Sequence, residues 1–215
     1  MKVNILSSGF PNGFTDVFIG EVRRHLASRG LFVFVASDFR LREKTRRYCD
    51  HFLALFREKG IVFDEVFIVD YGVSPAESAA RIRSADVVWL AGGPTLTQMA
   101  HIREYGLGGA LRSRDGLTIG MSAGSINMAR RVVLARDVRD DVSETTVYEG
   151  IGLADIHVEP HWNEADAEHR EDVRRAARIA PIHALHDDAF IVERDGAVEV
   201  FGTCEVLDER EPERE

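Results

Sequence analysis

The chain has 215 residues, of which 45% are hydrophobic and 29% charged, the balance of a soluble globular protein that can bury a sizeable core. Its formal net charge of −9 argues against a nucleic-acid partner, because proteins that bind phosphate backbones gather Lys and Arg on one face. The two cysteines, Cys49 and Cys204, exclude a disulfide framework and show no CxxC metal spacing.

Predicted strands and helices alternate along the chain. The opening run Met1–Leu6 is too short for a signal peptide, and no apolar stretch approaches membrane-spanning length, so we expect a cytoplasmic protein with no membrane partner. Apolar runs predict strands at Val3–Leu6, Leu31–Ala36, Glu65–Val69, Val87–Ala91 and Leu117–Met121. Helical spacing predicts helices at about Thr15–Ser28, Glu43–Lys59, Pro75–Ser84 and Leu96–Tyr105, the third of them capped by Ser74.

Such βαβ units predict the fold class. It is an α/β three-layer sandwich, with a mostly parallel central sheet and helices on both faces. No linker divides the chain, so we expect one domain over residues 1–207, followed by an acidic, disordered tail at 208–215. Ligands of such sheets bind beyond the carboxyl ends of the strands.

One of those strand ends carries the segment Gly120-Met121-Ser122-Ala123-Gly124. A serine flanked by small residues between a strand and a helix is typical of a nucleophile elbow, in which the serine backbone is strained and its hydroxyl stands above the sheet edge. The alternative is an ordinary turn of small residues. The strand before Ser122 and the helix after it favour the elbow.

A second strand end carries Gly92-Gly93-Pro94-Thr95. Two glycines let backbone N–H groups approach a ligand closely, so the amides of Gly93 and Ala123 are candidates for an oxyanion hole. The alternative is a tight strand-to-helix turn. A phosphate loop is disfavoured, because no lysine follows as in the Walker pattern.

The candidate general base is His161. The segment Ile156–Trp162 alternates apolar and polar residues, which predicts a strand ending at Pro160 with His161 emerging from its end. Strand geometry puts His157, Glu159 and His161 on one face, so a metal site formed by these three is an alternative. A purely structural histidine is another.

A carboxylate is needed to hold the imidazole in the correct tautomer. The candidates are Asp137, Asp140, Asp141, Glu159, Asp187 and Asp188, and their spacing does not choose among them. The spacing does exclude an α/β-hydrolase, because the segment between Ser122 and His161 is too short for the further strands and helices of that fold.

In order and spacing, the serine, histidine and glycine motifs resemble the serine peptidase family of peptidase E, the aspartyl dipeptidase, and cyanophycinase. The resemblance extends from the first strand to a late hairpin at Asp195-Gly196. It implies a class I glutamine amidotransferase-like, flavodoxin-like scaffold, with Ser122 as nucleophile, His161 as base and Asp137 at the family's acidic position. It implies no metal and no organic cofactor. Pro94 stands where the family usually has asparagine.

The resemblance also implies a small peptide as substrate, selected by an amino-terminal aspartate. The implied substrate contacts are Gly92, Thr95 and Arg170, the last because Glu168-His169-Arg170-Glu171 is similar to the family's Glu-Thr-Arg-Glu stretch. Alternatively, Arg170 lies on the solvated face of a helix over Glu164–Ala177. Monomer and homodimer are both left open. Two other functions are also open: a glutamine amidotransferase-like amidase, which would need an elbow cysteine, and a non-catalytic domain that binds a small amino-acid or acyl ligand.

Overall fold

The computed structural model describes residues 1–140 and 142–211, with the side chain of residue 139 excepted. Asp141, one of the candidate carboxylates, and residues 212–215 of the predicted tail therefore lie outside the described residues. The helices are Asp16–His25 (α1), Arg42–Glu58 (α2), Pro75–Ser84 (α3), Thr95–Glu104 (α4), Gly108–Ser113 (α5), Ala123–Ile126 (α6) and Ala167–Ala177 (α7), with a 3-10 turn at Val138–Asp140 (η1).

The strands form a large sheet, a small sheet and a two-stranded ribbon. They are Lys2–Ser7 (β1), Leu31–Val35 (β2), Glu65–Val69 (β3), Val87–Leu90 (β4), Gly116–Met121 (β5), Arg131–Leu134 (β6), Thr146–Glu149 (β7), His157–Glu159 (β8), Ile182–Leu185 (β9), Phe190–Arg194 (β10), Ala197–Phe201 (β11) and Cys204–Leu207 (β12).

The large sheet has the strand order β11-β10-β1-β5-β4-β2-β3. The five strands from β1 to β3 in this order are parallel, and β10 and β11 extend the sheet as an antiparallel hairpin. This hairpin turns at Asp195 and Gly196, which have φ of 52° and 83°, as a tight two-residue turn requires. The predicted α/β class and mostly parallel sheet are confirmed.

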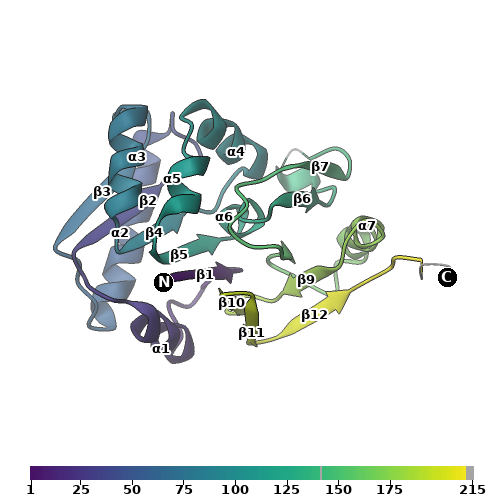
Figure 1. Ribbon diagram of the computed structural model, residues 1–215. Coiled ribbons are helices and arrows are strands. Elements are labelled where there is room, and N and C mark those ends of the chain that lie inside the picture. Colours follow the sequence, from purple (N-terminus) through teal and green to yellow (C-terminus); the bar gives the residue numbers. More distant parts are fainter. Residues whose placement is uncertain (141, 212–215) are drawn as a thin grey trace.

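Strands β1, β5, β4 and β2 are buried along most of their length because both faces of the sheet are covered. On one face, side chains such as Ile5, Phe34 and Trp89 pack against α1 and α2. On the other face, Val33 and Leu90 are part of the cluster that includes residues of α3, α4 and α5. These two helical layers lie below and above the sheet in the view of Figure 1, where α1 is below and α3, α4 and α5 are above. The arrangement is the predicted three-layer sandwich.

The predicted elements are all present, with small differences at their ends. Thr15 and Ser74 cap α1 and α3 through side-chain bonds to the amides of Phe18 and Glu77, so the predicted cap at Ser74 is confirmed. No helix within residues 1–140 and 142–211 is long and apolar enough to cross a membrane.

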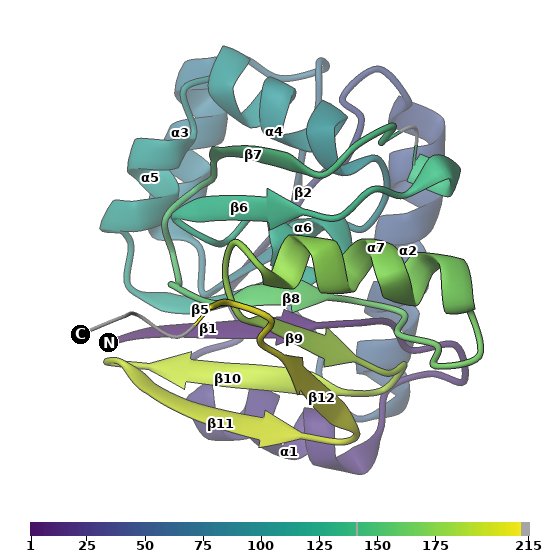
Figure 2. The same cartoon turned by 90° about the vertical axis from the view of Figure 1, so that its right-hand side faces the viewer.

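The small sheet was not predicted, although one of its strands, β8, lies within the strand predicted in the segment Ile156–Trp162. It has the order β12-β9-β8, with β8 and β9 parallel. Helix α7 packs on it through Val173, Ala176 and Ala177, which share a core cluster with Ile182 and Ala184 of β9. Figure 2 shows α7 alongside β8, with β5, β1 and β10 of the large sheet side by side below them. The predicted strand that carries the histidine therefore belongs to a second sheet.

Candidate active site

Ser122 occupies the sharp turn between β5 and α6. Its backbone has φ of 50° and ψ of −114°, a conformation that costs a non-glycine residue of the order of 1–3 kcal/mol. The turn is held by the neighbouring strand, because the Ser122 amide donates to the carbonyl oxygens of Ser7 at 2.9 Å and Ser8 at 3.1 Å. The observed backbone is that of the predicted nucleophile elbow.

Gly120 and Gly124, two residues before and after Ser122, lie so close to neighbouring backbone atoms that no larger residue fits. A Cβ on Gly124 would lie 2.2 Å from the carbonyl oxygen of Leu90, and a Cβ on Gly120 would lie 2.6 Å from the amide nitrogen of Ser125. Both obstacles are backbone atoms, which cannot move without opening the sheet or the turn. The Gly-x-Ser-x-Gly pattern is therefore imposed by packing against β4 and α6.

The glycine turn after β4 lies beside Ser122. A Cβ on Gly92 would lie 3.3 Å from the Cβ of Ser122, and Gly93 has φ of 139°. Within the described residues, the amides of Gly93 and Ala123 have no hydrogen-bond partner. Two N–H groups without an internal partner therefore lie on the segments next to the nucleophile, and the oxyanion hole at Gly93 and Ala123 stays a prediction.

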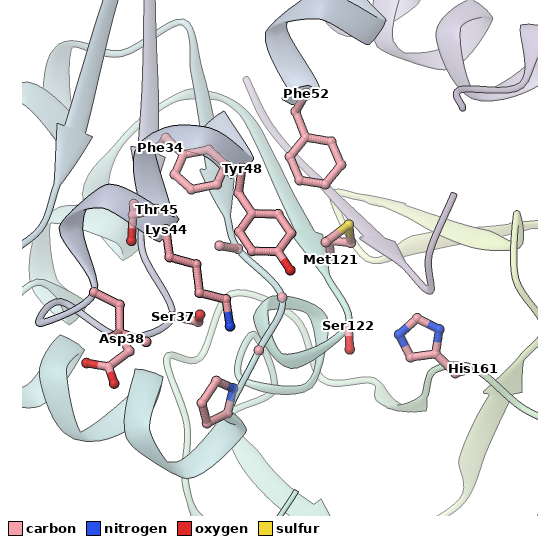
Figure 3. Close-up of a pocket in the computed structure, with 15 residues that line it drawn as sticks. Phe34, Ser37, Asp38, Lys44, Thr45, Tyr48, Phe52, Met121, Ser122 and His161 are labelled. Atoms are coloured by element: carbon pink, nitrogen blue, oxygen red, sulfur yellow. The ribbon is translucent and has the colours of Figure 1, made fainter. Parts of the chain in front are cut away.

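His161 follows Pro160 at the end of β8 and, like Ser122, has a positive φ, of 57°. Its amide donates to the hydroxyl oxygen of Ser8 at 2.7 Å, and its Nδ1 lies 2.7 Å from Oδ1 of Asp187. Because Nδ1 donates to the carboxylate, the other ring nitrogen, Nε2, is left as an acceptor on the ring edge that faces Ser122 in Figure 3. The Ser122 hydroxyl and the ring form no hydrogen bond in the described structure, and such bonds often tighten only when substrate binds.

The carboxylate at the His161 ring is Asp187 and not the predicted Asp137. Strands β8 and β9 are parallel neighbours, so the segments that follow them, with His161 and Asp187, emerge at the same edge. Asp137 instead follows β6 of the separate ribbon, and its backbone pairs with Val142. Asp137 therefore lies in another part of the wall of the site, and not next to the imidazole as predicted.

The other described candidate carboxylates, Asp140, Glu159 and Asp188, form no hydrogen bond with the His161 ring. Asp140 accepts from the amide of Thr95 at 3.1 Å. Glu159 is buried and lies 3.0 Å from Nε2 of His169, and burial raises its pKa. Burial and the neighbouring Asp187 raise the pKa of Asp188. Asp140 and Glu159 are thus hydrogen-bonded away from the His161 ring, whereas Oδ1 of Asp188 is buried without a hydrogen-bond partner among the described residues.

The three residues His157, Glu159 and His161 do not converge on a common point. Nε2 of His157 donates to the carbonyl oxygen of Arg131 at 2.7 Å, while the Glu159 and His161 side chains bond to His169 and Asp187. Among the described residues, no group of three His, Cys, Asp or Glu side chains is arranged to hold a metal ion. The alternative of a metal site formed by this trio has no geometric support.

Two cavities meet at Ser122 and His161. The first, which we call the α2 cavity, has a volume of about 210 Å³ and lies between α2, with Lys44 and Tyr48, and the turn at Gly92 and Gly93. The second, the β8 cavity, has a volume of about 590 Å³, and its lining includes Thr95, Asp137, Asp140 and Glu159. The candidate nucleophile and the candidate base thus line both cavities.

Arg170 lines neither of these two cavities. It lies on α7, and its guanidinium donates to the carbonyl oxygen of Glu164 at 3.0 Å, in the loop that leads into the helix. In this structure Arg170 thus makes a local contact near the start of α7, and its contact with substrate stays a prediction. Of the other predicted contacts, Gly92 lines the α2 cavity and Thr95 the β8 cavity.

Two positioning residues, Ser8 and Gly9, were not predicted. The Ser8 hydroxyl accepts from the amide of His161 and lies 3.4 Å from Oδ1 of Asp187, while its carbonyl oxygen accepts from Ser122. The loop after β1 thus joins the three residues of the site. A small polar turn, Ser7-Ser8-Gly9, at the carboxyl end of the first strand was the available signal.

We expect Gly9→Ala to lower peptide hydrolysis by about tenfold or more while the protein stays folded. The added Cβ would lie 2.7 Å from Cε1 of His161 and 3.0 Å from Oδ1 of Asp187, so the imidazole must shift, and small displacements of a catalytic group are costly in rate. Gly20→Ala is the control, because a Cβ there meets nothing within 4 Å. Steady-state kinetics and thermal unfolding of both variants check this, and equal activities would remove Gly9 from the site.

A strained serine at a strand end, a histidine held by a carboxylate and two free amides define the site of a serine hydrolase on an α/β sandwich. The chain belongs to peptidase family S51, whose family model matches residues 13–201. It is therefore a peptidase of the serine type, as the resemblance in the sequence implied.

Two solved structures are similar to the chain in fold. A protein assigned as a peptidase E from Listeria monocytogenes EGD-e aligns with a TM-score of 0.71 at 18% sequence identity, covering 94% of this chain and 98% of its own. A peptidase from an acI-B1 Actinobacterium aligns with a TM-score of 0.73 at 14% identity, covering 97% of this chain and 91% of its own. No curated protein is significantly similar to the chain in sequence.

Proposed function

We propose that this serine peptidase hydrolyses small peptides through an acyl-enzyme formed on Ser122. The observation that carries the proposal is the placement of Ser122, in a strained turn at the end of β5, opposite a histidine whose Nδ1 is held by Asp187. In the proposal, Ser122 is the nucleophile, His161 the general base, Asp187 the residue that orients the imidazole, and Gly93 and Ala123 the oxyanion donors.

The reaction follows from these positions. Nε2 of His161 takes the hydroxyl proton as Oγ of Ser122 bonds to the peptide carbonyl carbon, and the carbonyl oxygen becomes an oxyanion at the two amides. Collapse of this intermediate breaks the C–N bond, and His161 gives the proton to the leaving amine. Water then attacks the acyl-enzyme, loses a proton to His161 and releases the acid, after which the proton returns to Ser122. Removing one oxyanion donor typically costs about 10²–10³ in turnover.

The two cysteines do not support the amidase alternative. Cys49 is fully buried on α2, and burial raises the pKa of its thiol to about 12. Burial also raises the pKa of Cys204, which lies on β12. Neither cysteine is at the elbow, and neither has the lowered pKa of a reactive thiol.

Two experiments test the proposal. A fluorophosphonate probe labels only an activated serine, so it should label the wild-type protein and not the Ser122→Ala variant. A dipeptide library then tests the reaction, and the comparison of Asp-Leu with Ala-Leu tests the aspartate preference that the resemblance implies. Labelling without hydrolysis of any library member would contradict the peptide substrate, and labelling of the Ser122→Ala variant would contradict the nucleophile.

We expect His161→Ala to lose peptide hydrolysis by several orders of magnitude, whereas His157→Ala stays within about threefold of wild type. The reason is position: the His161 ring faces Ser122, while Nε2 of His157 donates to the Arg131 carbonyl. Turnover numbers of the two variants, each with its unfolding midpoint, check the assignment. An inactive His157 variant beside an active His161 variant would reverse it.

A further inference from the structure

The α2 cavity has apolar walls and a cationic side chain. Phe34, Phe52 and Met121 line it, together with Tyr48 and Lys44 of α2. Figure 3 shows Lys44 and Tyr48 extending from α2 toward the side on which Ser122 lies. The cavity that contains Ser122 therefore offers a substrate group both apolar surface and the ammonium of Lys44.

The Asp38 carboxylate also lines this cavity, but its negative charge is already paired with a cationic side chain. The Asp38 carboxylate accepts from Nε and Nη2 of Arg40 at 2.9 and 3.0 Å, and Nε2 of His101 lies 3.3 Å from it. The hydrogen bonds from Arg40 lower the pKa of Asp38 to about 2. Asp38 is thus a carboxylate that already has its cation.

Lys44 has no such partner. Within residues 1–140 and 142–211 it forms no salt bridge, and its Nζ lies over the Tyr48 ring, 5.8 Å from the ring centroid. An ammonium on one wall of a cavity that also contains the nucleophile favours an anionic substrate group. The phenol of Tyr48, on the same wall, is a second donor in reach of that group.

We propose that Lys44 binds a carboxylate of the peptide substrate and is the specificity-determining cation of this site. The inference rests on the proposed peptidase function and deepens it. The carboxylate comes from one of two sources, an acidic side chain next to the scissile bond or the carboxyl terminus of a short peptide. Both present the same group to the ammonium, and matched substrates separate them.

The test compares Lys44→Met with Arg46→Met. Both remove one positive charge from α2, but Arg46 does not line the cavity. Wild type and both variants are assayed with Asp-Leu, Asn-Leu and Asp-Leu amide. If the side chain is the ligand, Lys44→Met lowers the ratio of kcat/KM for Asp-Leu to that for Asn-Leu by about tenfold, the usual effect of a charged hydrogen bond. If the terminus is the ligand, the ratio of Asp-Leu to its amide falls instead.

Arg46→Met should leave both ratios as in wild type, and Lys44→Arg, which keeps the charge, should restore most of the lost discrimination. Unchanged ratios in Lys44→Met would overturn the inference while the peptidase function stands. Binding of Asp-Leu to Ser122→Ala and to the Ser122→Ala, Lys44→Met double variant, measured by calorimetry, judges Lys44 without hydrolysis. Equal affinity in the two proteins, or no binding to either, overturns it. Absence of hydrolysis in wild type, with a binding difference retained, counts against the proposed function alone.

Discussion

Ser122→Ala is expected to lower peptide hydrolysis by several orders of magnitude and to abolish fluorophosphonate labelling, with the fold intact. The alanine keeps a Cβ and leaves the backbone bonds from residue 122 to Ser7 and Ser8 in place, so only the hydroxyl is lost. Removal of a triad nucleophile costs about 10⁶ in turnover where it has been measured, because the remaining groups act only through it. Steady-state kinetics and circular dichroism of the variant check the expectation.

Ser113→Ala is the matched control for this variant. Its hydroxyl lies on α5 and bonds to the carbonyl oxygen of Ala110, away from both cavities of the site. Its loss is expected to change turnover by less than twofold. Retention of more than about a tenth of wild-type turnover by Ser122→Ala would exclude Ser122 as the nucleophile and with it the acyl-enzyme.

The central sheet and the elbow were predictable because their signals are local. A buried parallel strand is a short apolar run, and the residues that follow each such strand meet at one edge of the sheet. The Gly120–Gly124 segment records its own packing, since backbone atoms of Leu90 and Ser125 leave no room for larger side chains. Strand assignment alone therefore placed Ser122 next to the Gly92-Gly93 turn.

The partner of the histidine was not predictable in the same way. The choice between Asp137 and Asp187 depends on which strand pairs with β8, and that pairing joins segments far apart in the sequence. The periodicity of β8 identified a strand, but it did not show that the strand leaves the large sheet. The resemblance favoured Asp137, whereas the parallel pairing of β8 with β9 brings Asp187 to the ring.

The residues that line the substrate cavities were also not predictable from local sequence patterns. Arg170 was selected from a short match in sequence, yet its guanidinium bonds to the carbonyl of Glu164. Lys44 lies on a helix whose sequence is rich in charge, and nothing in that pattern separates it from Arg46 or Arg47. What distinguishes Lys44 is that it lines a cavity together with the Gly92-Gly93 turn, and such a cavity wall forms only when segments far apart in the sequence pack together.

The second large effect is expected from Asp187→Asn, which should lower kcat by roughly 10²–10⁴, against less than tenfold for Asp137→Asn. The carboxylate of Asp187 accepts from Nδ1 of His161 at 2.7 Å and so keeps Nε2 free to take the Ser122 proton. An amide at this position offers an N–H to Nδ1 and favours the tautomer that is protonated on Nε2, which cannot act as a base. The effect should fall toward the lower end of the range, because the side chain of Asp187 is 44% exposed and water can replace part of its role.

Asp137→Asn is the matched control for Asp187→Asn, because both carboxylates lie near Ser122 and His161. Asp137 lines the β8 cavity without being the group at the His161 ring, so its amide variant should act mainly on KM. Kinetics of the two single variants and of the double variant separate the roles: the double variant should match Asp187→Asn in kcat. If Asp137→Asn instead causes the larger loss of kcat, with Asp187→Asn close to wild type, then the imidazole is oriented from the β6 side, and the His161–Asp187 hydrogen bond has no part in the reaction.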